Sequence, residues 1–228
     1  MIAGRLTEVR SRIATAARSV GRDPSSIQLI AVSKTCPLDA VREAYAAGQR
    51  DFGENRVQEA LEKIHHATEP DIRWHLLGHL QTNKARKTVG AFASIQSVDS
   101  DDLLLKLERA ALDEGIVQEV LLQVAVTYEA TKFGVPPDDM PRLFEIGTRL
   151  EAVRIVGVMT IPPPAPTPEG ARPWFRRLRE LCDGWQAAGV PPAMLRELSM
   201  GMSGDFEVAI QEGATMVRVG TAIFGSRG

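Results

Sequence analysis

The sequence lacks several features that mark large classes of proteins. Only two cysteines, Cys36 and Cys182, occur in its 228 residues, too few for a disulfide framework or a zinc-binding cysteine cluster. No apolar run approaches the ~20 residues that cross a bilayer. The N-terminus, MIAGRLTEVR, carries charges throughout and has no signal-peptide core. These absences predict a protein of the reducing cytoplasm that has no membrane partner.

A charge excess of either sign is also missing. The formal net charge is −2, so we expect no overall attraction to nucleic acid or to an anionic membrane. The sequence shows no internal repeat and no metal-ligand cluster. With 44% hydrophobic residues, the chain can bury one large core. We therefore expect a single domain over residues 1–228 and no resident metal.

The most informative stretch of the chain is IQLIAVSKT, from Ile27 to Thr35. Its short, nearly continuous apolar run predicts a strand that is buried on both faces, as in a parallel sheet. Cys36 and Pro37 follow, and they predict a helix with proline in its first turn. The pattern therefore places Lys34 where a buried strand ends.

Lys34 differs from the other lysines of the chain in its predicted surroundings. The other five are Lys63, Lys84, Lys87, Lys106 and Lys132, and we expect their ammonium groups to be hydrated. Apolar neighbours would partly desolvate Lys34, lower its pKa and make the amine a better nucleophile for a carbonyl. On this stretch alone, a structural lysine whose ammonium reaches water is the simpler interpretation.

Strands and helices are predicted to alternate along the chain. Alternation predicts a parallel sheet, and eight units close a (β/α)₈ barrel. A doubly wound open sheet is the alternative. The helix over 2–20 is additional, and it would cover the barrel's bottom or pack on its outside. The predicted strands cover 27–35, 50–54, 72–78, 91–98, 119–127, 153–161, 194–199 and 214–219; further helices are expected over 37–48, 55–67, 81–89, 100–114, 136–150, 172–188, 205–211 and 221–224.

The proline-rich segment from Pro162 to Pro168 interrupts this alternation. Its five prolines cannot donate to a regular strand ladder. It is either a rigid loop or a linker. Because the strand and helix pattern resumes after it, a loop is the favoured interpretation.

Two segments at the predicted strand ends have the composition of anion sites. In a barrel of this kind, active sites lie at the carboxyl ends of the strands, and phosphate sites recur after strands seven and eight. The seventh loop, 199–205, combines glycines with two hydroxyls, and the eighth offers Gly220 and Thr221 before a helix start. Ordinary turns explain each alone; together they favour a phosphate site. Gly201–Gly204 is not a G-x-S-x-G nucleophile elbow, which argues against a serine hydrolase.

A lysine and a phosphate site at one barrel mouth suggest pyridoxal 5′-phosphate as the cofactor. Lys34 would form a Schiff base with it, and the loops would hold its phosphate. Arg218, in the eighth strand, could hydrogen-bond the pyridine nitrogen and keep it unprotonated, which weakens the ring as an electron sink. A structural salt bridge is the alternative role for Arg218.

Six motifs together make the sequence resemble the YggS/PROSC family of pyridoxal phosphate homeostasis proteins, over nearly the whole chain. They are LIAVSKT at 29–35, FGENRVQE at 52–59, WHLLGHLQTNK at 74–84, GVMTI at 157–161, LSMGMSGDF at 198–206 and VRVGTAIFG at 217–225. The resemblance implies a barrel like the N-terminal domain of alanine racemase, carrying pyridoxal phosphate in vitamin B6 homeostasis.

The resemblance also implies roles for individual residues. Lys34 would carry the cofactor, Arg218 would face the ring nitrogen and Asn55 would lie near the ring. Phosphate contacts would come from Ser199, Ser203, Gly220 and Thr221. The segment 125–134 departs from the family, which usually has asparagine, glycine and serine before Ser-Lys-x-Gly. Family roles for that asparagine and serine do not carry over to this chain.

The competing activities are a cofactor carrier without turnover, an amino-acid racemase and a class I aldolase. A two-base racemase needs a second base, which in alanine racemases is a tyrosine from a second domain, and this chain leaves no room for that domain. Tyr45 is expected in the core, Tyr128 lies in the variable segment, and His79 is the remaining candidate, better explained as a loop histidine. We therefore expect no catalytic residue and no robust turnover. We expect a monomer that makes transient contact with apoenzymes requiring pyridoxal phosphate.

Overall fold

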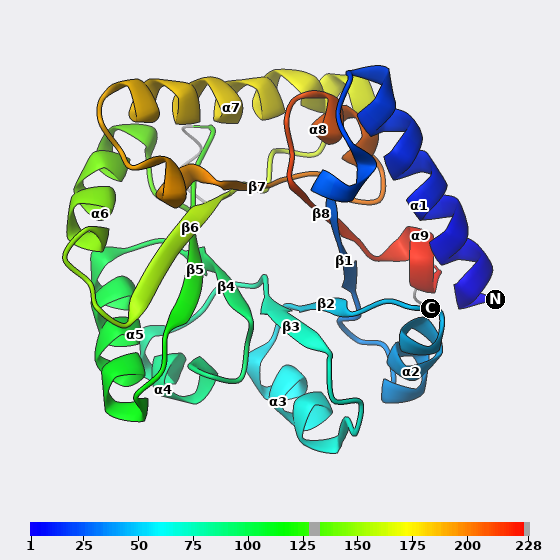
Figure 1. The fold of residues 1–228 in the computed structure, drawn as a ribbon, viewed down its shortest axis with the longest axis horizontal. Coiled ribbons are helices and arrows are strands. Elements are labelled where there is room, and N and C mark those ends of the chain that lie inside the picture. Colours follow the sequence, from blue (N-terminus) through cyan, green and yellow to red (C-terminus); the bar gives the residue numbers. More distant parts are fainter. Residues whose placement is uncertain (128–132, 226–228) are drawn as a thin grey trace.

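Eight parallel strands form a closed barrel in the computed structural model, which describes residues 1–127 and 133–225. Each strand pairs with the next along the chain, and β1 pairs with β8 to close the ring. Figure 1 shows the strands in the centre and the helices around them. The barrel is confirmed and the open sheet is excluded. The strands are β1 Gln28–Val32, β2 Asp51–Glu54, β3 Arg73–Leu76, β4 Ser94–Val98, β5 Gln118–Gln123, β6 Val153–Met159, β7 Glu197–Ser199 and β8 Met216–Val219.

The first strand shows why its sequence is an apolar run and not an alternation. Leu29 and Ala31 belong to the large core between the strands and the outer helices. Ile30 and Val32 point the other way and belong to a separate cluster inside the barrel. Successive side chains of a strand point to opposite faces, so burial of both faces requires apolar residues at every position.

The helices cover the outside of the barrel, and α1 is one of them. It packs against α8, α9 and α2, so the question of its location is settled in favour of the outside. Its buried face consists of residues at the three- and four-residue spacing of an amphipathic helix, Ile2, Leu6, Val9, Ile13, Ala16 and Ala17. The helices are α1 Ile2–Ser19, α2 Leu38–Ala46, α3 Val57–His66, α4 Ala85–Thr88, α5 Asp101–Glu114, α6 Met140–Gly147, α7 Arg172–Ala187, α8 Phe206–Gln211 and α9 Thr221–Phe224.

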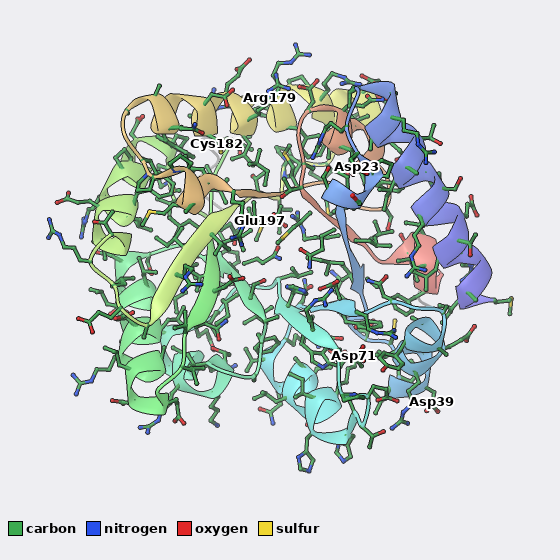
Figure 2. All side chains as sticks on the ribbon, viewed as in Figure 1. Asp23, Asp39, Asp71, Arg179, Cys182 and Glu197 are labelled. Atoms are coloured by element: carbon green, nitrogen blue, oxygen red, sulfur yellow. The ribbon has the colours of Figure 1, made fainter. Side chains whose placement is uncertain are left out.

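Side chains fill the inside of the barrel. Figure 2 shows sticks throughout the ring of strands, with Glu197 of β7 among them, whereas Arg179 lies on the outer helix α7. The interior combines polar side chains with one apolar cluster, as expected of a barrel that is a packed core and not a pore. That cluster consists of Ile30, Val32, Leu77, Leu121, Val156, Met159 and Met216.

Several local expectations were wrong. Pro37 is the N-cap of α2 and not part of its first turn. The seventh strand is shorter than predicted, because residues 192–195 form a 3₁₀ turn before β7 begins at Glu197.

The proline-rich segment is a loop, as expected. It leaves β6 and leads through a 3₁₀ turn at Pro168–Ala171 directly into α7. Among the described residues, every helix is too short or too polar to span a bilayer.

Candidate functional site

A cavity of about 390 Å³ opens at the carboxyl ends of the strands. This is the end of the barrel where the fold places active sites, and the volume is in the range of small-molecule sites. Six of the seven predicted site residues lie on its wall, and Ser199 does not. The wall consists of Val32, Lys34, Asn55, Leu77, Ile161, Met202, Ser203, Gly204, Arg218, Gly220 and Thr221.

Lys34 reaches the cavity from the turn that follows β1. Val32, the last residue of that strand, points into the barrel and also lines the cavity. Lys34 follows two residues later, in the turn beyond the last strand residue, and is half-buried. The turn, and not the alternation of β1, therefore sets where the amine lies.

Arg218 forms part of the cavity wall from β8 and is 4% exposed. Its Nη1 donates to Ser199 Oγ at 2.8 Å, and its Nη2 donates to the Thr160 carbonyl at 2.8 Å. Burial lowers the pKa of the guanidinium to about 10, an effect that the charge of Asp205 partly opposes. Arg218 therefore remains a cation at neutral pH, and its two hydrogen bonds go to uncharged oxygens.

Ser199 lies behind Arg218 and is completely buried. Its hydroxyl accepts from Arg218 and donates to Gln96 Oε1 at 2.6 Å. A phosphate in the cavity would therefore meet Arg218 before Ser199. The structure places Ser199 behind Arg218 and not on the cavity wall, and it adds the contacts of Gln96 and Thr160, which were not predicted from the sequence.

The seventh and eighth loops meet at Ser203. The Ser203 hydroxyl accepts from the backbone N–H of Gly220 at 3.1 Å and of Ala222 at 3.4 Å. The loop is folded tightly, with Asp205 accepting from the Met202 N–H at 2.6 Å. A Cβ on Gly201 would lie 2.5 Å from that of Ala209, and its φ is +91°, so glycine is required there. Hydroxyls and N–H groups therefore face one corner of the cavity.

Asn55 approaches the cavity from the end of β2 and is half-buried. The third loop presses against its backbone, since a Cβ on Gly78 would come within 2.0 Å of the Asn55 carbonyl oxygen. Ser97 holds that loop by donating to the Gly78 carbonyl at 2.7 Å. The position of Asn55 is therefore fixed by a close backbone contact that only glycine allows.

The candidates for a second base lie elsewhere or outside the described residues. His79 contacts Asp99 at 3.2 Å, stacks on Phe133 with ring centroids 4.0 Å apart, and does not line the cavity. Tyr45 packs partly on the core and donates to Asp71 at 2.5 Å. Tyr128, and with it half of the divergent segment, lies outside the described residues. The described part of the chain contains no group of three or more metal-ligating side chains.

Lys63 corrects the expectation that Lys34 is the one lysine held away from water. It is 8% exposed, and its Nζ donates to Glu54, Glu59 and the Ser33 carbonyl, each at 2.8 Å. It follows Ala60 by three residues, at the edge of the predicted inward face of α3. That spacing was the available signal, together with Glu59 one helical turn before it.

A larger hollow of about 670 Å³ lies at the other end of the barrel. Asp51 lines it, accepting from Gln28 at 2.8 Å and from both Arg73 Nε and Nη2, and contacting His75 at 2.9 Å. Desolvation raises the pKa of Asp51, but the hydrogen bonds from His75 and Arg73 outweigh it and lower the pKa to about 2. None of the predicted site residues lies at this end.

The chain is similar to proteins of known family over its whole length. Residues 5–228 match the family described as alanine racemase, N-terminal domain. The pyridoxal phosphate homeostasis protein of Aquifex aeolicus is 45% identical over 98% of this chain and 97% of its own length, and that of Pseudomonas aeruginosa is 44% identical over 99% and 96%.

Solved structures agree with these sequence relatives. PipY of Synechococcus elongatus is 45% identical, and the match covers 99% of this chain and 100% of PipY. The TM-score is 0.88 for the form without pyridoxal phosphate and 0.85 for the form with pyridoxal phosphate bound.

Proposed function

Because the chain belongs to the alanine racemase N-terminal domain family and, within it, to the pyridoxal phosphate homeostasis proteins, we propose that it binds pyridoxal 5′-phosphate at the barrel mouth. It takes part in intracellular vitamin B6 homeostasis. The observation that carries the proposal is that Lys34, Arg218 and the Ser203 loop line one cavity. The bound cofactor in PipY, at 45% identity, supports it.

Lys34 holds the cofactor as a Schiff base. The uncharged amine adds to the aldehyde carbon, the C=N bond forms, and the aldehyde oxygen leaves as one water molecule. The step consumes no oxidant or reductant and is reversible. A reversible covalent bond of this kind fits a carrier, because its hydrolysis returns the Lys34 amine and pyridoxal phosphate unchanged.

The cavity offers a donor for each polar part of the cofactor. The Ser203 and Thr221 hydroxyls suit a phosphate dianion, and the Gly220 N–H, which donates to Ser203 Oγ, can donate to the phosphate once the Ser203 hydroxyl turns toward it. Arg218 suits the pyridine nitrogen as a hydrogen-bond donor, with Ser199 holding it in place. Asn55 lies on the wall near the end of β2, where it can contact the ring. The donor set therefore fits pyridoxal phosphate.

The protein acts as a carrier without robust turnover. The described residues of the cavity wall supply one amine, one guanidinium, one amide and hydroxyl groups among apolar side chains. A cation at the pyridine nitrogen keeps the ring a weak electron sink, and this composition supports storage better than two-base racemisation. The whole chain, 1–228, is one binding unit, a cytoplasmic monomer that delivers the cofactor through transient contact with apoenzymes.

An absorbance experiment tests the proposal. Purified protein mixed with pyridoxal phosphate is expected to show the yellow Schiff-base band, and borohydride should bleach it. Peptide mapping should place the reduced adduct on Lys34 and not on the other five lysines. In a separate, unreduced sample, an apoenzyme that requires the cofactor should gain activity, and this protein should have lost the band once the two proteins are separated.

Two results would contradict the proposal. An adduct on another lysine would remove Lys34 from its role. Racemisation or transamination of amino acids by the purified protein, abolished by Lys34→Ala, would show an enzyme and not a carrier.

A further inference from the structure

The turn that carries Lys34 has a strained backbone. Thr35 has φ +61° and is the one non-glycine residue with positive φ among residues 1–127 and 133–225. This left-handed conformation is unfavourable for a residue with a branched Cβ. Such a conformation persists only where the surroundings enforce it.

Side chains of β2 and α3 enforce it from both sides of Lys34. On one side, Ser33 Oγ donates to Glu54 at 2.6 Å, and the Ser33 carbonyl accepts from Lys63 at 2.8 Å. On the other side, Glu59 accepts from the Thr35 N–H at 2.5 Å. The residues before and after Lys34 are therefore held by two carboxylates and one ammonium, Glu54 through the Ser33 hydroxyl and the other two through the backbone.

Lys63 joins these contacts into one unit. It donates to both Glu54 and Glu59 at 2.8 Å, so all three ammonium hydrogens are used. Desolvation raises the pKa of Glu54, whereas for Glu59 the hydrogen bonds from Lys63 and Thr35 outweigh desolvation and lower the pKa. Glu54 and Lys63 are shielded from solvent, with exposed fractions of 0% and 8%.

Stability alone does not account for this buried cluster. Glu54 Oε2 is buried and has no hydrogen-bond partner among the described residues. An unsatisfied buried oxygen is unfavourable, and buried ion pairs are often no more stable than apolar residues of the same volume. A function in positioning explains why charges are retained here.

We propose that Lys63, through Glu54 and Glu59, is a positioning residue that clamps the turn at 33–35 and so aims the Lys34 amine into the cavity. The inference rests on the proposed function, because it assigns Lys63 to the same Schiff base. It predicts that Lys63 affects cofactor capture only through Lys34. Misplacing a reacting group by about 1 Å can cost about a hundredfold.

A double-mutant cycle tests this, with pyridoxal phosphate as the probe. Lys63→Met keeps the side-chain volume and removes the ammonium. We expect it to weaken cofactor binding and slow Schiff-base formation, each by about tenfold or more. In a Lys34→Ala background, where binding is non-covalent, Lys63→Met should change the affinity by less than about twofold.

Lys106→Met is the matched control. It also removes a lysine that pairs with a carboxylate, Asp102 at 3.1 Å, but this pair is exposed on α5. It should leave capture and its rate unchanged. Should Lys63→Met fail to fold, Ser33→Ala removes one bond of the clamp and should slow capture about threefold.

The outcomes separate the proposed clamp from a general structural role of Lys63. If Lys63→Met reduced the affinity for pyridoxal phosphate equally with and without Lys34, Lys63 would have a general structural role, and the clamp would be overturned. Unchanged capture in Lys63→Met, or in Ser33→Ala where Lys63→Met does not fold, would overturn it as well. Failure of the unmodified protein to capture pyridoxal phosphate would instead overturn the proposed function, and the clamp with it.

Discussion

The two ends of the barrel differ in how their charges are compensated. At the amino ends of the strands, Asp51 contacts Arg73 and His75 directly. At the carboxyl ends, the hydrogen bonds of Arg218 go to the uncharged oxygens of Ser199 and Thr160. The first hollow is larger, about 670 Å³ against about 390 Å³. Arg10, which lines the larger hollow, also donates to uncharged oxygens of Ala47 and Gln49, but it is exposed. A buried arginine without a directly paired counter-ion, and not volume, therefore distinguishes the carboxyl ends of the strands.

Replacing Lys34 should give the largest effect. Lys34→Ala is expected to lose the Schiff-base band completely, because among the described residues of the cavity wall no other side chain is a primary amine. The fold should remain, since the barrel core does not include the amine. Absorbance measures the first effect and circular dichroism the second. A collapsed mutant would show that Lys34 is structural.

Replacing Asp51 should act on stability and not on cofactor binding. Asp51→Asn removes the carboxylate from a buried network, which is expected to lower the free energy of unfolding by about 3 kcal/mol. Urea unfolding measures the loss. Cofactor affinity should change by less than about twofold, because Asp51 lies at the other end of the barrel. A large loss of affinity would break the division between the two ends.

Replacing Arg218 should show the reverse pattern. Arg218→Met removes a charge-assisted hydrogen bond to the cofactor, worth about 2 kcal/mol, and should weaken binding about thirtyfold. Spectroscopic titration with pyridoxal phosphate measures it. Arg73→Met is the matched arginine at the opposite end and should leave the affinity unchanged. Equal effects of the two variants would contradict the comparison.

Acid should weaken the network at the amino ends. The folded pKa of Asp51 is about 2, below its ordinary value of 3.8, so its contribution is fully present above about pH 4 and is lost as the pH falls toward 2. The shift corresponds to roughly 2 kcal/mol. Unfolding free energies of the unmodified protein and Asp51→Asn should converge over that range. Curves of unfolding free energy against pH that stayed parallel would contradict the lowered pKa of Asp51.

Replacing Ser199 should give the smallest effect. Ser199→Ala removes the hydroxyl that accepts from Arg218 and donates to Gln96. Because it acts on the cofactor only through the orientation of Arg218, cofactor affinity should fall about fivefold, which corresponds to about 1 kcal/mol. The same titration measures it. An effect as large as that of Arg218→Met would show that Ser199 contacts the phosphate itself, as the family resemblance implied.

The barrel and most of its cavity residues could be predicted because they depend on local order along the chain. Eight alternating units specify the topology, and the position after each strand specifies the mouth. The links between distant strands could not be predicted. Gln96, Ser199 and Arg218 meet across the barrel from β4, β7 and β8, and no periodicity reports that contact. Lys63 was missed for the same reason, since its burial depends on Glu54 in another element.

The pairing of β1 with β8 makes the site depend on both the first and the last strand of the chain. Lys34 follows the first strand and Arg218 lies in the last, and these strands are neighbours in register from Gln28 beside Met216 to Ala31 beside Val219. During synthesis on a ribosome, the amine emerges almost two hundred residues before its partners at the mouth. A nascent or truncated chain therefore has the lysine without the cavity, and capture of the cofactor reports that the barrel has been completed.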